Sequence, residues 1–112
     1  MTANSWLYGF LDVCIVRLLL EQRDYGLGIA KRLEDAGFSS VPGGTLYPAL
    51  VRLETSGLIV GEREASRTGP PRKYFRLTEE GRRAAHAGAA DWESFSAQMS
   101  RVMGAGSAAV RK

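Results

Sequence analysis

The sequence predicts one small, mainly α-helical protein with a β-hairpin and a long C-terminal helix. Three observations carry this prediction. Apolar residues recur at helical spacing through the first half of the chain, two strand-like stretches flank a Gly/Pro-rich connection, and residues 79–102 read as one uninterrupted helix. A chain of 112 residues with 45% hydrophobic and 24% charged residues is ordinary for a globular protein with one modest core.

Composition also excludes several classes of protein. No apolar run reaches the ~18 residues of a membrane span, and the N-terminus lacks a signal-peptide layout, so we expect a cytoplasmic protein with no membrane partner. The single cysteine, Cys14, excludes an internal disulfide, and one histidine, His86, leaves no ligand set for zinc. No Ser/His/Asp set, carboxylate pair or phosphate loop is visible. We therefore expect no metal, no cofactor and no enzymatic activity.

Three helices are expected before the hairpin. The first spans about residues 6–21, where apolar residues follow helical spacing. The second begins at Leu27 or Gly28, after a break at residues 24–26, and ends at Gly37 as a C-terminal cap. The third spans about residues 44–55.

Two short strands are expected at residues 58–64 and 73–78, joined by the sequence ASRTGPPR. Because side chains alternate along a strand, Phe75 and Leu77 should face the core. Thr78 is a plausible N-cap for the final helix, since acidic residues follow it directly.

The final helix is too long to be covered by a domain this small. At ~1.5 Å per residue it extends roughly 35 Å, whereas a domain of about 75 residues has a radius of gyration near 11–12 Å. Its distal half carries a coiled-coil-like seam of apolar residues, which favours a homodimer. The alternative is that the seam folds back onto the core of its own chain. The expected dimer contacts are Leu7, Phe10, Leu11, Trp92, Phe95, Met99 and Val102.

Three helices, a hairpin and a long helix in this order describe a winged helix-turn-helix with a C-terminal dimerisation helix. We expect the DNA-binding domain at residues 1–78, the dimerisation helix at 79–103 and a disordered tail at 104–112. Between Arg63 and Arg83 there are seven basic residues and three acidic ones, so the hairpin forms a basic wing. Its two prolines stiffen the tip, which suits contacts to phosphates at fixed positions.

Two segments carry a resemblance to a known family. PGGTLYPALVRLETSGLI (residues 42–59) and GPPRKYFRLTEEGRR (69–83) closely resemble the signature of PadR-like transcriptional regulators. The segment YGLGIAKRLEDAG (25–37) resembles the second helix of that family, with Leu27 and Gly28 in place of the usual aromatic and acidic residues. The likeness spans about residues 7–103, and the single C-terminal helix is similar to the smaller subfamily.

The resemblance implies a dimeric repressor that binds double-stranded DNA at a palindromic operator. Two glycines leave the start of the recognition helix open, so that its first amides can approach a phosphate. Thr45 can contact a base edge or a phosphate, Tyr47 is free to swing outward, and Pro48 falls within the first turn of the helix, where a proline is tolerated. The basic residues supply positive charge. The predicted DNA-binding residues are Gly43, Gly44, Thr45, Tyr47, Pro48, Arg52, Arg67, Arg72, Lys73 and Tyr74.

A planar aromatic effector is a further expectation. In the PadR family flat aromatic ligands bind near inter-subunit surfaces, and aromatic rings stack on planar molecules. The candidate residues are Trp6, Tyr8, Trp92 and Phe95. The alternative is that these rings fill the dimer core. For the whole protein, the alternative function is a winged-helix module that binds another protein and not DNA.

Overall fold

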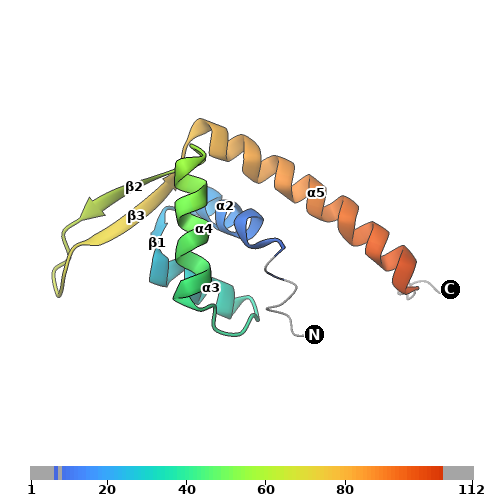
Figure 1. Ribbon diagram of the computed structural model, residues 1–112, viewed down its shortest axis with the longest axis horizontal. Coiled ribbons are helices and arrows are strands. Elements are labelled where there is room, and N and C mark those ends of the chain that lie inside the picture. The colour runs from blue at the N-terminus through green and yellow to red at the C-terminus, as the bar shows by residue number, and fades with distance from the viewer. Residues whose placement is uncertain (1–6, 8, 105–112) are drawn as a thin grey trace.

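The computed structural model describes residue 7 and residues 9–104. Figure 1 shows three short helices grouped together, with a β-hairpin projecting on one side and one long helix leaving on the other. The described part measures 56 × 28 × 20 Å. The elements are α2 (Leu11–Glu21), β1 (Asp24–Tyr25), α3 (Gly26–Asp35), α4 (Gly43–Thr55), β2 (Ile59–Glu64), β3 (Arg72–Leu77) and α5 (Glu79–Met103). The predicted mainly α fold with a small hairpin is confirmed.

The sheet has three antiparallel strands in the order β1-β3-β2, so β3 is central. The hairpin pairs Ile59 with Leu77 at its base and Glu64 with Arg72 near its tip. Strand β1 differs from the expectation for residues 24–26, where the sequence predicts only a break between two helices. Two residues are too few to show an alternating pattern, and their partners lie about fifty positions later in the chain.

Two helix starts also differ from the prediction. α3 begins at Gly26, directly after β1, and not at Leu27 or Gly28. α2 begins at Leu11, because Gly9 and Phe10 form a turn whose Phe10 amide donates to the Leu7 carbonyl at 2.7 Å. The ends of α3 and α4 follow the prediction, since residues with positive φ (Gly37 and Gly57) terminate them.

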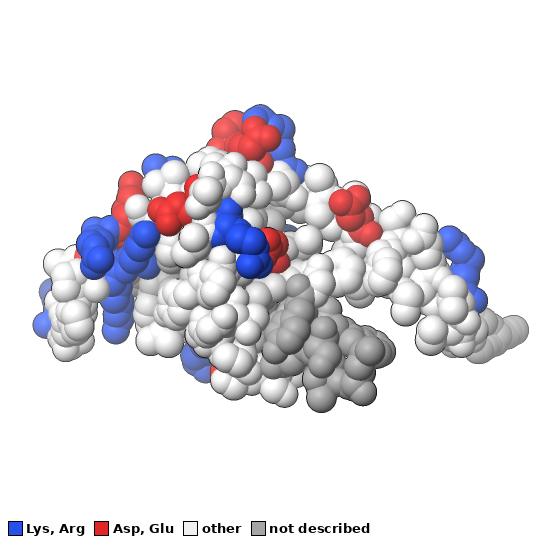
Figure 2. Space-filling view, viewed as in Figure 1, with Lys and Arg blue, Asp and Glu red and all other residues white. Residues whose placement is uncertain are grey.

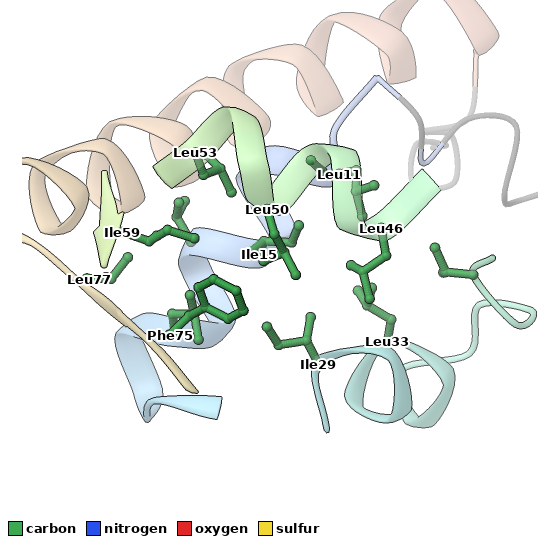
Figure 3. Close-up of a cluster of buried hydrophobic side chains, with 14 of the residues drawn as sticks. Leu11, Ile15, Ile29, Leu33, Leu46, Leu50, Leu53, Ile59, Phe75 and Leu77 are labelled. Carbon is green, nitrogen blue, oxygen red and sulfur yellow. The ribbon is translucent and has the colours of Figure 1, made fainter. Parts of the chain in front are cut away.

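The core lies where α2, α3 and α4 meet the base of the hairpin (Figure 3). Its most deeply buried large side chains are Ile15, Ile29, Leu46, Leu50 and Ile59. Phe75 and Leu77 are 5% and 6% exposed, which confirms that this face of β3 points inward. Burial of this hairpin face fixes the wing to the helices.

Two residues predicted to form the dimer interface belong to this core instead. Leu7 and Leu11 are 3% and 2% exposed within a single chain, so their side chains are already covered by their own chain. Helical spacing marks an apolar face but does not tell which neighbour covers it. Leu7 and Leu11 are therefore core residues of their own chain and not dimer contacts.

A close contact joins α5 to the end of α4. Thr78 caps α5, since its Oγ1 accepts from the Gly81 amide at 3.0 Å and donates to the Gly57 carbonyl at 2.7 Å. Gly81 is buried there, and a Cβ on it would lie 2.0 Å from the Leu58 carbonyl oxygen. This glycine is therefore required for close packing, although it lowers helix propensity.

We predict that Gly81→Ala destabilises the fold. The added methyl meets backbone, which cannot swing aside, and overpacking of this kind costs about 1–3 kcal/mol. Chemical denaturation should show a lower midpoint with an unchanged slope. Gly69→Ala is the control, because a Cβ there meets nothing within 4 Å. Equal midpoints for the two variants would contradict this account of the junction.

Candidate nucleic-acid interface

An open groove of about 490 Å³ separates α4 from the wing. Leu27, Tyr47 and Val51 line it from the helices, and Pro71, Arg72 and Lys73 line it from the hairpin. We call it the α4–wing groove. It brings together residues from the predicted recognition helix and the predicted wing, which are separated by about twenty positions in sequence.

α4 turns one face to the core and an adjacent, exposed face to this groove. Leu46, Ala49, Leu50 and Leu53 are buried, whereas Tyr47 and Val51 are 46% and 60% exposed. The helix starts at Gly43, one residue earlier than expected, with Pro42 as its N-cap residue. Its first amides therefore lie at the exposed end of the helix, where no preceding helical carbonyl can accept from them.

Among the predicted DNA-binding residues of α4, Tyr47 lines the groove and the others do not. Gly43 and Gly44 are exposed at the helix start, and a Cβ on Gly44 would meet nothing within 4 Å. Thr45 is half-buried and does not line the groove. Pro48 is exposed, but it is the sixth residue of α4 and so lies beyond the first turn where it was placed. Because proline has no amide hydrogen, the carbonyl of Gly44 does not receive the usual helical hydrogen bond from position 48.

Tyr47 is held between the starts of two helices. A Cβ on Gly26 would lie 2.6–2.9 Å from atoms of the Tyr47 ring, and one on Gly43 would lie 3.4 Å away. The ring therefore occupies space that any larger residue at position 26 would fill. This contact holds the aromatic side chain at the helical edge of the groove, against the start of α3, whereas the sequence predicts a ring that is free to swing outward.

Two predicted DNA contacts are engaged in ion pairs. Arg52 lies outside the groove and donates to Asp12 of α2 at 2.9 Å. Lys73 reaches from the wing to Glu54 of α4 at 3.2 Å. Both pairs are exposed, and such pairs contribute only about 0–1 kcal/mol, so a phosphate can replace the carboxylate at little cost.

A stack of two aromatic rings between two cations lies along the outer face of the sheet. The Arg23 guanidinium lies 4.6 Å from the Tyr74 ring centre, the Tyr74 and Tyr25 rings are 5.3 Å apart, and Arg72 lies 4.6 Å from the Tyr25 ring. Tyr74, predicted as a DNA contact, is half-buried in this stack. The stack holds Arg72 at the mouth of the groove.

Arg23 also anchors the far end of the stack. It donates to both carboxylate oxygens of Glu64, one of them at 3.1 Å. This hydrogen bond lowers the pKa of Glu64 below its usual value and raises that of Arg23. Tyr25, Arg23 and Val51 were not among the predicted site residues. The alternating basic and aromatic residues of the second strand were the available signal for the stack, but nothing local pointed to a third strand beside it.

Positive charge gathers at the wing end of the molecule. Figure 2 shows Lys and Arg side chains over the hairpin, with acidic side chains between them. Arg67 is exposed in the connection between β2 and β3. Within the described part of the chain, neither Arg67 nor Arg72 forms an ion pair. These two cations are available for an anionic partner.

The apolar seam of α5 remains largely uncovered. Trp92, Phe95 and Met99 are 49%, 40% and 36% exposed, and Val102 is 76% exposed. Phe10 was expected against the seam of a partner chain, but it packs against its own chain, 5.5 Å from Trp92 and 5.2 Å from Phe95 between ring centres. Trp6 and Tyr8, the other predicted aromatic residues, lie outside the described residues.

Three further features of the described part of the chain concern metal binding, the single cysteine and membrane insertion. No group of three or more His, Cys, Asp or Glu residues there is arranged to hold a metal ion. Cys14 is partly buried, and this burial raises the pKa of its thiol. Among residue 7 and residues 9–104, no helix combines the length and hydropathy of a membrane span.

A helix with an open glycine start beside a basic hairpin defines a winged helix-turn-helix protein of the DNA-binding class. The chain belongs to the transcriptional regulator PadR-like family, whose model matches residues 15–87. Members of this family are DNA-binding regulators of transcription.

Solved structures are similar over most of the chain. A Streptococcus transcriptional regulator is 32% identical with a TM-score of 0.77, covering 88% of this chain and 96% of that one. A PadR-like regulator from Bacillus cereus is 30% identical with a TM-score of 0.78 and the same coverage. Bacillus subtilis PadR in complex with operator DNA is 26% identical with a TM-score of 0.62, over 73% of this chain and 44% of that one.

We predict that Gly44→Ala weakens DNA binding without weakening the fold. An added methyl group meets no atom within 4 Å, and alanine favours the helix by up to about 1 kcal/mol. A Cβ at this exposed helix start would instead obstruct a phosphate approaching the first amides. Paired measurements of denaturation midpoint and DNA affinity check this. Unchanged affinity would remove the start of α4 from the interface.

We predict that Tyr25→Leu weakens DNA binding, whereas Tyr25→Phe leaves it near the wild-type value. Phenylalanine keeps the ring under Arg72 and leucine does not. A cation–π contact at an exposed site contributes about 0.5–1 kcal/mol, so the leucine variant should lose roughly two- to fivefold in affinity per subunit. The measurement is DNA affinity at several salt concentrations. Identical behaviour of the two variants would show that the stack does not position Arg72.

Proposed function

We propose that the protein is a homodimeric repressor that binds a palindromic operator and acts in the cytoplasm. One observation carries the DNA-binding part: the open start of α4, an apolar groove and a basic wing lie on one face of the molecule. An anionic duplex fits this face because cations at the wing can meet phosphates while α4 meets base edges. The B. subtilis PadR structure contains operator DNA, which supports the same use of the fold here.

The proposed division of labour follows the shape of the chain. Residues 1–78 form the DNA-binding unit, and residues 79–103 form the helix that joins two copies. Figure 1 shows the distal half of α5 leading away from the helices and the wing. A symmetric dimer would place two recognition helices about 34 Å apart, one turn of the major groove. This spacing is the reason to expect a palindromic site.

The dimer interface is proposed at the distal half of α5. An exposed apolar stripe runs along this half of the helix and consists of Trp92, Phe95, Met99 and Val102. Contiguous exposed apolar surface of this kind indicates an interaction surface. A second copy of the same stripe would cover it with two-fold symmetry. Phe10 extends the stripe, because it already contacts two of these rings.

The same aromatic cluster is the proposed effector site. The Phe10, Trp92 and Phe95 rings lie 5.2–6.4 Å apart between centres and leave the indole half exposed. A planar aromatic molecule inserted between two such clusters would stack on them. It would release the operator only to the extent that it binds one dimer geometry better than the other.

We predict that Arg72→Ala lowers the salt dependence of DNA binding. Each lost phosphate contact should reduce the slope of log affinity against log salt by about 0.9, and a dimer carries the change twice. Lys73→Ala should lower the slope similarly and also leave Glu54 facing the DNA without its cation. Arg101→Ala on α5 is the control of equal charge. If none of the three variants alters DNA binding, the wing does not contact DNA. That result would favour the alternative function, a module that binds another protein.

We predict that Phe95→Glu converts the dimer into monomers. An unpaired charge in an apolar interface costs about 3–5 kcal/mol. Ala97→Glu is the matched control, because position 97 lies on the opposite side of α5 from the seam. Sedimentation velocity at micromolar concentration distinguishes the species. A stable wild-type monomer would contradict the proposed assembly.

A further inference from the structure

The surface of the α4–wing groove that the helices provide is apolar. Leu27 is 68% exposed, Val51 is 60% exposed and Tyr47 is 46% exposed, and all three line the groove. Single exposed apolar residues are common on proteins, but three that converge on one groove mark a binding surface. Tyr47 is additionally fixed in place by its contact with Gly26.

Apart from the hydroxyl of Tyr47, this surface offers few groups that can hydrogen-bond to a base. α4 contains no Asn, Gln or Lys, and its arginine is paired with Asp12 outside the groove. The carboxylate of Glu54 is engaged by Lys73 and by the Gly61 amide at 3.3 Å. Bidentate reading of guanine or adenine needs the side chains that are missing here. Sequence discrimination by α4 must therefore depend largely on apolar contact.

Only one base presents an apolar group in the major groove, and that group is the C5 methyl of thymine. We propose that Leu27, Tyr47 and Val51 read thymine methyl groups, so that the operator carries thymines where α3 and α4 meet it. This inference rests on the proposed function and specifies the DNA that the groove selects.

Charge complementarity identifies the occupant of the groove as DNA. The apolar surface is bordered by the wing, where Arg72 has no carboxylate partner among the described residues and Lys73 is held by one weak, exposed pair. A base edge and its flanking phosphates present this combination, an apolar methyl within a few ångströms of negative charge. An apolar helix of a protein partner would leave these cations unmatched.

The experiment uses the full chain and a duplex enriched from a random pool by repeated rounds of binding. The same duplex is then made with 2′-deoxyuridine in place of thymidine, which removes the methyl and keeps every base-pairing group. Burial of one methyl-sized group corresponds to about a fourfold change in affinity. One contacted methyl in each half-site should make the uracil duplex roughly sixteenfold weaker, since the two fourfold effects multiply.

Two variants separate methyl reading from a general effect of uracil on the duplex. Val51→Thr keeps the side-chain shape but exchanges a methyl for a hydroxyl, so it should bring the thymine-to-uracil affinity ratio closer to one. Arg72→Ala should weaken both duplexes and leave that ratio unchanged. A ratio that responds equally to both variants would overturn the proposal.

Two other results would also decide against it. Tight, selective binding of an enriched duplex that is indifferent to uracil would overturn methyl reading and leave the proposed function intact. Failure to enrich any duplex would overturn both proposals and assign the groove to a protein partner.

Discussion

The two residue pairs between β1 and β3 are the constraint on which the rest of the structure depends. Asp24 pairs with Phe75 and Tyr25 with Tyr74, so the segment between α2 and α3 is bonded directly to the central strand of the wing. Gly26 follows at once and starts α3 against the ring of Tyr47. The wing, the start of α3 and the outer face of α4 are thereby held in one arrangement.

Electrostatics reinforces that arrangement and prepares the surface for an anion. Asp24 is only 8% exposed and accepts from the Tyr25 amide at 2.8 Å and from Arg32 at 3.4 Å, so its buried carboxylate is satisfied. Lys73 and Arg52, by contrast, are held by exposed carboxylates in weak pairs. The buried carboxylate of Asp24 is paired within the fold, whereas two exposed cations, Lys73 in the groove and Arg52 outside it, can exchange one anion for another.

The sequence predicts those parts of the fold that depend on residues close together in the chain. The inward face of Phe75 and Leu77 follows from alternation, and the cap of Thr78 follows from the residues just after it. β1 and the stack on Tyr25 depend on pairing across about fifty residues, which no local pattern reports. The same limit explains why Leu7 and Leu11 were assigned to a partner chain when their own chain covers them. The resemblance of two sequence segments to PadR-like regulators predicts the family. Of the α4 residues that this resemblance implies as DNA contacts, Tyr47 lines the groove and the others do not.

Hydrogen exchange of the backbone amides, with and without a bound duplex, tests most directly whether α4 and the wing act as one DNA-binding face. The amides of Gly43 and Gly44 have no helical carbonyl four residues earlier to donate to, and they should exchange rapidly in the free protein. Bound DNA should slow exchange at residues 43–47 and at the wing residues 66–69, 72 and 73 together, with the distal half of α5 unchanged. Protection confined to α5, or to the wing without the start of α4, would contradict it.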